Sequence, residues 1–356
     1  MSGSLTGRQV IQVVAIVLLA GLVVWVLALW LPLAYDMHTF FYPAIHDWLD
    51  GGLSDADWPD LNYTPWELMV FVPFALAPEP VGRALFLVFA IGVIVWATRS
   101  FARRRLALAM VFVSFPVLAM FWMGNMEPFP LLGAALSAWA IRERRPWVLG
   151  LGLVLLATKP QEAFLVAPVL LWAVRRWRRS EWVQVALAPI VVAFLTVALF
   201  DWSWLRKLLN APGGYQSRWM WINISMWWRF APYGVAWLCS IGVAVAGLVL
   251  IIRRRFDEYA LALAVTFGAV ASPYLATHHL VLPMTLAWPW LLDRKPWLAV
   301  LVYLTSLTPL ARLGGDQSVN WLDFLFPLTL AVTLLFFYRQ SARSEGHRSV
   351  STEVAA

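Results

Sequence analysis

Residues 82–105, GRALFLVFAIGVIVWATRSFARRR, join an apolar run of membrane-spanning length to four arginines at its C-terminal end. Loops rich in Lys and Arg stay in the cytoplasm, so this stretch predicts a span that ends there. The apolar segment before it, 66–78, has thirteen residues and contains Pro73, whereas a bilayer needs ~20. If 66–78 does not cross, one alternation satisfies every arginine cluster along the chain. If it crosses, the later clusters all fall outside.

The composition indicates an all-α polytopic membrane protein. Of 356 residues, 61% are hydrophobic and 13% are charged, against about 25% charged in a soluble domain. The net charge of +7 could suggest a nucleic-acid partner. However, the cations lie between apolar runs, where they set the orientation of membrane spans, and we expect no nucleic-acid partner. The single cysteine, Cys239, provides neither a disulfide framework nor a thiolate metal site.

The alternation predicts one membrane domain, 1–356, of about twelve transmembrane helices with both termini in the cytoplasm. It places 20 of the 27 Lys and Arg residues on that side. We also expect a first outer loop with interfacial helices at 33–81, a second outer loop at 201–232 and a cytoplasmic tail at 339–356. The predicted spans are 10–32, 82–98, 106–123, 128–141, 147–158, 160–174, 182–200, 233–252, 258–275, 279–292, 297–313 and 320–338.

In this topology, the ionisable residues at span ends gather on one side of the membrane. The carboxylates, the isolated lysine and the histidine pair all fall on the outer face, whereas the inner face carries mostly arginine. We therefore expect a functional site outside. The residues at these outer span ends are Asp36, Glu127, Lys159, Glu162, His278 and His279.

Asp36 follows the first span at the membrane boundary and opens a long segment, 35–65, that is rich in acids and aromatics and has no Lys or Arg. An ionisable group at such a boundary is a functional-site hypothesis, and we predict that Asp36 is a catalytic base. The alternative is an acidic cap at the N-terminus of an interfacial helix, which the helix dipole favours.

Two outer turns carry further polar residues, each with a structural alternative. Asn125 and Glu127 lie in a tight turn before Pro128. They either bind a substrate or only stabilise the turn. Lys159 is a lone cation at a helix junction and could bind phosphate. Alternatively, Glu162 could neutralise it in a structural ion pair.

His278 and His279 follow a polar break that includes Tyr274, and an imidazole can donate to phosphate or take part in proton transfer. Adjacent residues point in different directions on a helix, so we expect at most one of the two histidines to face a site. A metal centre needs three or four ligands at workable spacing, and the sequence does not supply them convincingly. We expect no metal and no cofactor.

The loop 201–232 mixes tryptophan with cations, among them Arg229. It forms either an interfacial helix at the head groups or a platform for a glycan acceptor or a lipid-linked donor. Asn223 also begins a glycosylation sequon, which matters only in a host that glycosylates.

The order of these motifs resembles that of the polytopic GT-C glycosyltransferases, and among them glycosyltransferase family 87. Tyr-Thr-Pro at 63–65 replaces the more usual Tyr-Pro-Pro, and Met126-Glu127 departs from the family's residues after Gly124. The resemblance covers roughly 35–280. The motifs that carry it are Asp36 followed by Tyr42, Gly124-Asn125-x-Glu127, Lys159-Pro160, Asn223-x-Ser225 with Arg229, and Ser272-Pro273 with His278-His279.

The resemblance implies an inverting transfer of a mannose-like hexose or a pentose on the non-cytoplasmic face of the cell membrane. The donor would be a polyprenyl-phosphate sugar and the acceptor a lipid or glycan. It implies Asp36 as base and Lys159, His278, His279 and Arg229 at the donor phosphate. Tyr42, Tyr63, Asn125, Glu127, Glu162, Asn223 and Tyr274 would bind substrate. The lack of a Gly-rich phosphate loop argues against a nucleotide-sugar donor.

Two other interpretations stay open. A transporter or flippase for lipid-linked glycans should carry ionisable groups near mid-membrane and broken helices in related halves. Here the charges sit at one face and the sequence has no internal repeat that we detect. An inactive relative that serves as an assembly partner is the third interpretation.

Overall fold

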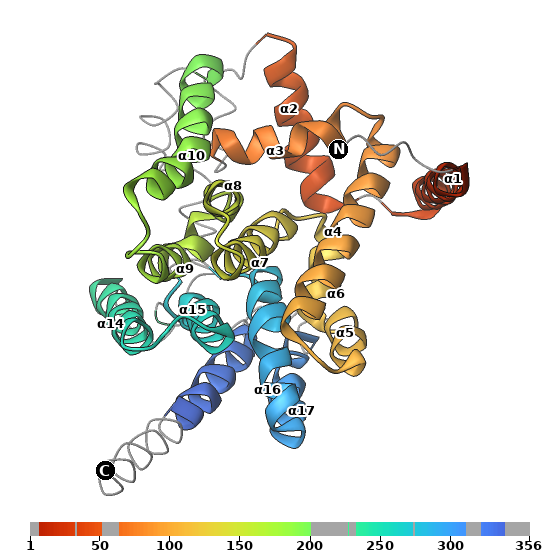
Figure 1. Cartoon of the computed structure of the whole chain (residues 1–356). Helices are drawn as coiled ribbons and strands as arrows, with labels where there is room; N and C mark the ends of the chain where they lie inside the picture. The colour runs from red at the N-terminus through yellow and green to blue at the C-terminus, as the bar shows by residue number, and fades with distance from the viewer. Residues whose placement is uncertain are drawn as a thin grey trace, which may run out of the picture.

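The computed structural model describes residues 7–32, 34–51, 64–200, 227, 233–272, 275–310 and 322–338, and the regular elements within these ranges are all helical (Figure 1). The predicted all-α class is confirmed. The second outer loop, apart from Trp227, and the C-terminal tail lie outside the described residues.

The helices follow the predicted spans closely, although several are shorter than a bilayer. Two short helices, α2 and α3, follow α1, and Pro73 lies inside α3. The bounds are α1 Gly7–Trp30, η1 Met37–Phe41, α2 Tyr42–Leu49, α3 Pro65–Ala75, α4 Glu79–Phe101, α5 Arg105–Phe112, α6 Phe115–Met123, α7 Pro128–Arg142, α8 Pro146–Leu156, α9 Pro160–Ala173, α10 Arg179–Phe200, α14 Tyr233–Ile252, α15 Glu258–Ala271, η2 Thr277–Leu280, η3 Pro283–Ala287, α16 Trp288–Arg294 and α17 Pro296–Thr305, with a last helix at Leu322–Tyr338.

Three of the described helices are long and apolar enough to cross a membrane by length and composition, namely Glu79–Phe101, Arg179–Leu199 and Gly234–Ile252. The bent pair α5 and α6 would make a fourth span. The other predicted spans are represented by shorter apolar helices of 10–17 residues. These apolar helices are those expected of a membrane protein. The presence of about twelve spans stays a prediction.

The stretch predicted as one span over 106–123 is two helices that meet at an angle of 51°. Pro116 has no backbone N–H and ends the helical pattern before it. Ser114 takes an extended backbone between the helices, and its hydroxyl donates to the carbonyl of Val111 at 2.7 Å. The sequence pattern missed this break because every residue except the serine and the proline is apolar.

Two buried clusters hold the bundle together. The larger one joins apolar faces of α4, α7, α9, α15 and α16 in the middle of the molecule (Figure 1). The smaller one packs η1, α2 and α3 against Met126 and Phe129 at the start of α7. Because this second cluster crosses from the first loop to α7, it fixes the segment that carries Asp36 against the centre of the bundle.

The arginine-rich helix ends lie together. The Arg103 backbone N–H donates to Asp293 at 2.7 Å, Arg142 pairs with Glu258 at 3.6 Å, and Arg144 pairs with Glu181 at 2.7 Å. We call the surface formed by these loops, 99–105, 142–145, 175–181, 253–258 and 293–295, the arginine face.

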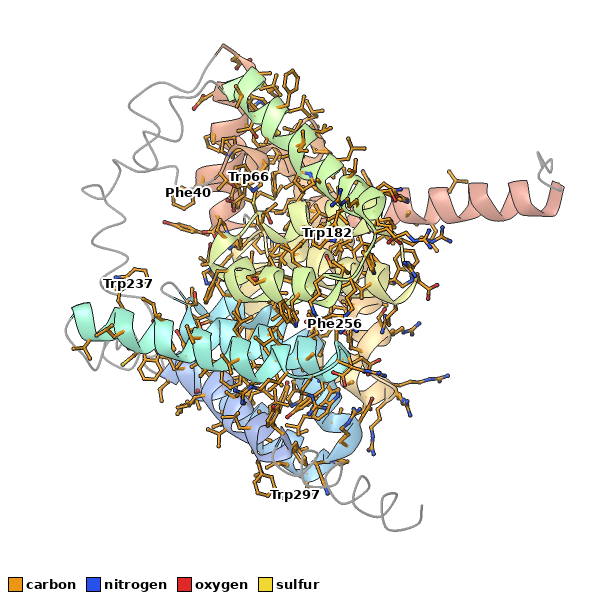
Figure 2. The ribbon with its side chains drawn as sticks, turned by 60° about the vertical axis from the view of Figure 1, so that its left-hand side comes forward. Phe40, Trp66, Trp182, Trp237, Phe256 and Trp297 are labelled. Atoms are coloured by element: carbon orange, nitrogen blue, oxygen red, sulfur yellow. The ribbon has the colours of Figure 1, made fainter. Side chains whose placement is uncertain are left out.

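The other ends of α7, α8, α9 and α15 lead to Glu127, Lys159 and Ser272. We call this end the site face. Figure 2 shows the same separation, with Phe40 and Trp66 on its left and Trp182 and Phe256 further to the right. The structure thus sorts the polar residues onto two opposite ends of the same helices.

Candidate active site

Four segments far apart in the sequence meet at the site face. Asp36 immediately precedes η1, and Asn125 and Glu127 form the turn between α6 and α7. Lys159 directly precedes α9, and His278 lies in η2. All five side chains are buried. Asp36 makes no side-chain cap hydrogen bond to η1, so the capping alternative does not account for it.

Gly124 allows the turn to approach the first loop. Its φ of +67° lies in the left-handed region that favours glycine. A Cβ built here would lie 2.5 Å from the Cβ of Ala34 and 3.2 Å from that of Met37. The glycine therefore lets the Asn125 turn lie directly against the segment that carries Asp36.

The side-chain amide of Asn125 links the four segments. Its Nδ2 donates to Asp36 Oδ2 and lies 3.1 Å from His278 Nε2. Its Oδ1 accepts from Lys159 Nζ at 2.7 Å and from the Met126 backbone N–H at 2.6 Å. The orientation of the amide is fixed because Lys159 and the N–H of Met126 can only donate.

Lys159 supplies the positive charge of this cluster. Its Nζ lies 2.5 Å from Glu127 Oε1, so Glu127 is its ion-pair partner, and the alternative of a pair with Glu162 is not formed. Burial lowers the pKa of Lys159, but the neighbouring carboxylates of Glu127 and Glu162 outweigh it and hold that pKa above its ordinary value. The ammonium stays charged inside the protein.

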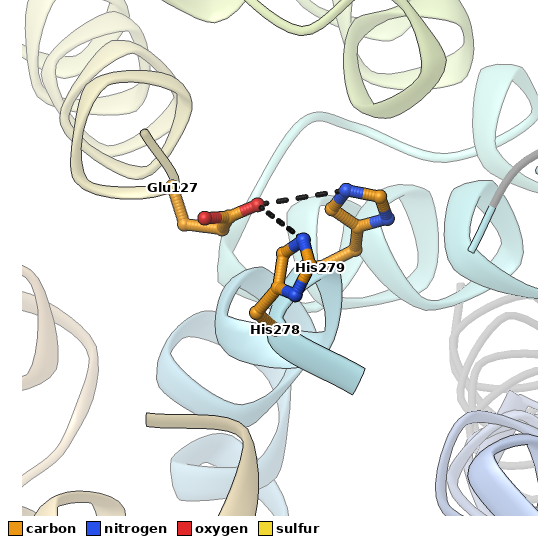
Figure 3. Close-up of side chains that lie close together, drawn as sticks. All are labelled: Glu127, His278 and His279. Carbon is orange, nitrogen blue, oxygen red and sulfur yellow. Dashed lines mark ion pairs between the residues drawn. The ribbon is translucent and has the colours of Figure 1, made fainter. Parts of the chain in front are cut away.

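Both histidines reach the same carboxylate. His278 Nε2 lies 3.7 Å and His279 Nε2 lies 3.6 Å from Glu127 Oε1 (Figure 3). The expectation that at most one of them faces the site is therefore wrong. The two rings lie edge to face with centroids 4.4 Å apart, and both turn Nε2 toward Glu127.

Glu127, His278 and His279 are close enough together to hold a metal ion, with ligand atoms within 4.8 Å of one another. Their hydrogen bonds favour a different use. His279 Nδ1 accepts the Ala276 N–H at 3.0 Å, so neutral His279 carries its proton on Nε2 and offers no lone pair to a metal there. Glu127 Oε1 is already bound by the Lys159 ammonium.

His278 is neutral in this setting. Burial lowers its pKa to about 4, although the Glu127 carboxylate opposes the shift. Its Nε2 faces the amide N–H of Asn125 and must therefore act as an acceptor. Its proton then lies on Nδ1.

Asp36 has the ionisation behaviour of a base. Burial raises the pKa of its carboxyl to about 6, opposed by the Lys159 ammonium and the Asn125 amide and increased by the Glu127 carboxylate. At neutral pH the group is mostly ionised, yet it is more basic than an ordinary aspartate. A pKa near the working pH favours general-base catalysis.

A model of glycosyltransferase family 87 matches residues 61–276. The chain belongs to glycosyltransferase family 87. No curated protein and no solved structure matched it.

The match to family 87 covers only part of the assembled site. Asn125, Glu127 and Lys159 lie within the matched residues, whereas Asp36 and the two histidines lie outside them. The hydrogen bonds of Asn125 connect the two groups. The geometry therefore extends the site beyond the residues that the family match covers.

The structure brings together six of the predicted site residues and leaves one apart. The hydroxyl of Tyr42 lies 2.9 Å from the Phe74 carbonyl and 2.7 Å from the Ala77 carbonyl, which fixes α2 against the end of α3. The six that meet are Asp36, Asn125, Glu127, Lys159, His278 and His279. Tyr63, Asn223, Arg229 and Tyr274 lie outside the described residues.

Glu162 lies next to this cluster, and its charge interacts with Lys159. Neither of its carboxylate oxygens has a hydrogen-bond partner among the described residues, although the side chain is buried. It lines a small cavity together with Gln161, Ser272 and His279. Its buried carboxyl oxygens therefore remain available to a polar group that enters this cavity.

Glu67 is a buried acid that the sequence analysis did not select. It lies in α3, and its Oε2 accepts the Thr64 backbone N–H at 3.3 Å. Burial raises its pKa to about 8, against the opposing Lys159 ammonium. The sequence did offer a signal for Glu67, namely an acid inside a short apolar helix near Asp36's segment. The sequence could not show its surroundings, because the neighbours of Glu67 come from distant parts of the chain.

Proposed function

We propose that this family 87 protein transfers a mannose-like hexose or a pentose, with inversion, from a polyprenyl-phosphate donor to a lipid or glycan acceptor. The observation that carries the proposal is the hydrogen-bonded link from Asp36 through Asn125 to the Lys159 ammonium. Through this link, one amide holds a carboxylate at its nitrogen and an ammonium at its oxygen, which supports a base and a cation acting together.

In the proposed reaction, the Asp36 carboxylate takes the proton of an acceptor hydroxyl. The hydroxyl oxygen attacks the anomeric carbon of the donor from the side opposite the phosphate. The bond from the anomeric carbon to the phosphate oxygen breaks, and polyprenyl phosphate leaves with that electron pair. Lys159 stabilises the negative charge on the leaving phosphate.

The charge balance assigns a role to a second cation. The described cluster has the carboxylates of Asp36 and Glu127 around one ammonium, that of Lys159, and a phosphate adds further negative charge. We therefore propose that Arg229 supplements Lys159 at the phosphate. His278 is neutral and adds only a polar contact, and Glu162 accepts from sugar hydroxyls.

We further propose that the site face lies on the non-cytoplasmic side, because the arginine face carries the cations that loops retain in the cytoplasm. Single cysteines in a Cys239→Ser background test this. Tyr35→Cys, next to Asp36, should react with an impermeant thiol reagent from outside, and Arg144→Cys should react only after the membrane is opened. The opposite pattern would reverse the sidedness.

The reaction is tested with the full-length protein in lipid nanodiscs and a synthetic polyprenyl-phosphate mannose donor, with product mass as the readout. The wild type should add one hexose to an acceptor glycolipid, and Asp36→Asn should reduce turnover by at least ~1,000-fold without loss of fold. Asp47→Asn, an exposed acid on α2, is the matched control. Comparable activity of Asp36→Asn and wild type would remove Asp36 as base.

The transporter interpretation makes a different prediction in cells. Mass spectrometry of envelope glycolipids would compare strains with no protein, the wild type and Asp36→Asn. A sugar increment that depends on Asp36 supports transfer. An intact glycolipid that merely accumulates on one side would support transport.

A further inference from the structure

A cavity of about 340 Å³ lies in the arginine face, between the end of α7, the start of α15 and the end of α16. Its volume is within the range of small-molecule sites. It combines aromatic side chains with two arginines. The lining residues that matter here are Phe101, Arg142, Phe256, Tyr259, Trp290 and Arg294.

This cavity is separate from the candidate active site. Arg142 ends α7, whereas Glu127 precedes its first residue, and a helix of 15 residues is about 22 Å long. In Figure 2, Phe256, which lines the cavity, lies to the right of Phe40, which is near Asp36. The proposed transfer reaction makes no use of these residues.

The two arginines are held by aromatic rings and keep free hydrogen-bonding capacity. The Arg294 guanidinium lies 4.0 Å from the ring of Trp290 and that of Arg142 lies 5.5 Å from the ring of Phe101. Arg294 donates to one carbonyl at 3.3 Å, and Arg142 has its ion pair with Glu258. Each guanidinium has five N–H donors, so most of them remain for a ligand.

Trp290 adds a donor that lacks a partner. Its side chain is buried and stacks on Tyr259 with ring centroids 4.4 Å apart. Its Nε1–H has no hydrogen-bond partner among the described residues. A buried indole N–H can only donate, and leaving it unsatisfied is unfavourable. An acceptor atom in the cavity would satisfy it.

The acidic residues at the cavity are already engaged. Asp257 Oδ1 accepts the Ala260 N–H at 2.8 Å as the cap of α15, and Glu258 pairs with Arg142. Beside the second oxygens of these two carboxylates, the cavity therefore retains donor capacity from two guanidinium groups and one indole. A phosphate group, with several acceptor oxygens and a negative charge, matches it.

We propose that this cavity binds the phosphate of a phospholipid head group on the arginine face. A lipid is favoured over free phosphate because exposed apolar side chains follow directly after Arg294. On α17, Trp297 is 66% and Leu301 is 53% exposed, which gives acyl chains a surface to cover. Basic pockets between helices at a membrane face bind anionic head groups in this way.

The test uses the full-length protein in detergent micelles and counts bound lipids by native mass spectrometry. Phosphatidylglycerol should bind saturably. A diacylglycerol with the same chains lacks the phosphate, and glycerol 3-phosphate lacks the chains, so both should bind at least 10-fold more weakly. Arg142→Gln with Arg294→Gln should lower phosphatidylglycerol affinity at least 10-fold. Trp290→Phe, which keeps a ring and removes the N–H, should lower it about threefold.

The control is Arg175→Gln with Arg176→Gln, which removes the same charge from the same face outside the cavity. It should bind phosphatidylglycerol like the wild type. An equal loss in the two double variants would show that general surface charge attracts the lipid and would overturn the site. A Trp290→Phe chain that binds as well as the wild type would place the lipid elsewhere. Glycerol 3-phosphate binding as tightly as the lipid would overturn the lipid assignment.

Discussion

Asp36 and Lys159 are bound to opposite ends of one side-chain amide, that of Asn125. The amide nitrogen donates to the aspartate, and the amide oxygen accepts from the ammonium at 2.7 Å. The two charged groups come from segments more than a hundred residues apart. Their relative position therefore depends on a neutral residue that has no acid–base chemistry of its own.

Replacing Asn125 tests this link. Asn125→Ala removes two charge-assisted hydrogen bonds at Asp36 and Lys159, and each such bond contributes about 1.5–3 kcal/mol. Two such bonds amount to at least ~3 kcal/mol, so we expect kcat to fall at least ~150-fold with little change in KM for the acceptor. Asn125→Asp, of equal size, should fall further because it sets a second carboxylate against Asp36. An Asn125→Ala enzyme with wild-type kcat would refute the positioning role.

The pH dependence of kcat/KM should show the ionisation of Asp36. The base must be unprotonated, so activity should fall as the pH drops through about 6, the raised pKa of this carboxyl. It should also decline as the pH rises through about 8, where Glu67 ionises and adds negative charge near Lys159. Steady-state rates between pH 4.5 and 9.5 measure both limbs.

Glu67→Gln is the control for the alkaline limb. The amide matches the protonated form of Glu67 and cannot ionise, so the decline near pH 8 should disappear while the acid limb stays. An acid limb near pH 4 in both proteins would mean that the base is an ordinary exposed carboxylate.

Lys159 and Glu127 should show strong coupling in stability. Lys159→Met leaves the buried Glu127 carboxylate without its ion-pair partner, and breaking a buried pair costs about 3–5 kcal/mol. Adding Glu127→Gln should recover most of that loss, because no buried charge then remains at the pair. Unfolding in detergent measures the free energies. Additive losses in the double variant would contradict the buried pair, and the double variant should remain inactive.

Gly124→Ala should destabilise the protein by about 1–3 kcal/mol, the usual cost of overpacking. The new methyl would lie 2.5 Å from the Cβ of Ala34, on a backbone with φ of +67°. Gly92→Ala is the matched control, because a Cβ there meets nothing within 4 Å in the middle of α4. The control should gain about 0.5–1 kcal/mol. Equal thermal midpoints for the two variants would argue against the close approach.

Chelators should leave transferase activity within about twofold of the untreated enzyme. Glu127 Oε1 accepts from Lys159, His278 Nε2 faces the Asn125 amide, and the Ala276 N–H at Nδ1 of His279 leaves the proton of that ring on Nε2. Activity assays after extended EDTA dialysis, with metal content checked, make the measurement. Loss of activity that zinc or manganese restores would assign a metal to this cluster.

The sequence predicted the helical class and most helix positions, because apolar runs and arginine clusters are local patterns. It also selected Asp36, Lys159 and Glu127, since each interrupts such a pattern at a helix end. The break at Ser114 was missed because it changes the backbone without changing the apolar character. Short helices were expected at 128–141 and 147–158, because these apolar runs already fall below the ~20 residues of a bilayer span.

The pairing within the site could not be predicted. Lys159 has Glu162 three residues away but binds Glu127, thirty-two residues away, because tertiary packing of α7 against α9 decides the partner. Asn125 looked like a turn residue, and its four-way hydrogen bonding depends on segments that only the fold brings together. Tyr42 fitted the family motif, yet its hydroxyl lies against the backbone carbonyls of Phe74 and Ala77 and not in the cluster around Asn125.

The short helices at the centre of the bundle bear on the depth at which chemistry takes place. α7, α9 and α15 have 15, 14 and 14 residues, so each rises about 21–22 Å, against about 30 Å for the hydrocarbon layer. In a membrane, water and head groups must dip inward at one or both ends of these helices. The lipid-linked sugar of the proposed reaction would then meet Asp36 near the depth in the membrane at which its phosphate already lies. The protein would bring an aqueous pocket down to the lipid and would not need to lift the lipid out.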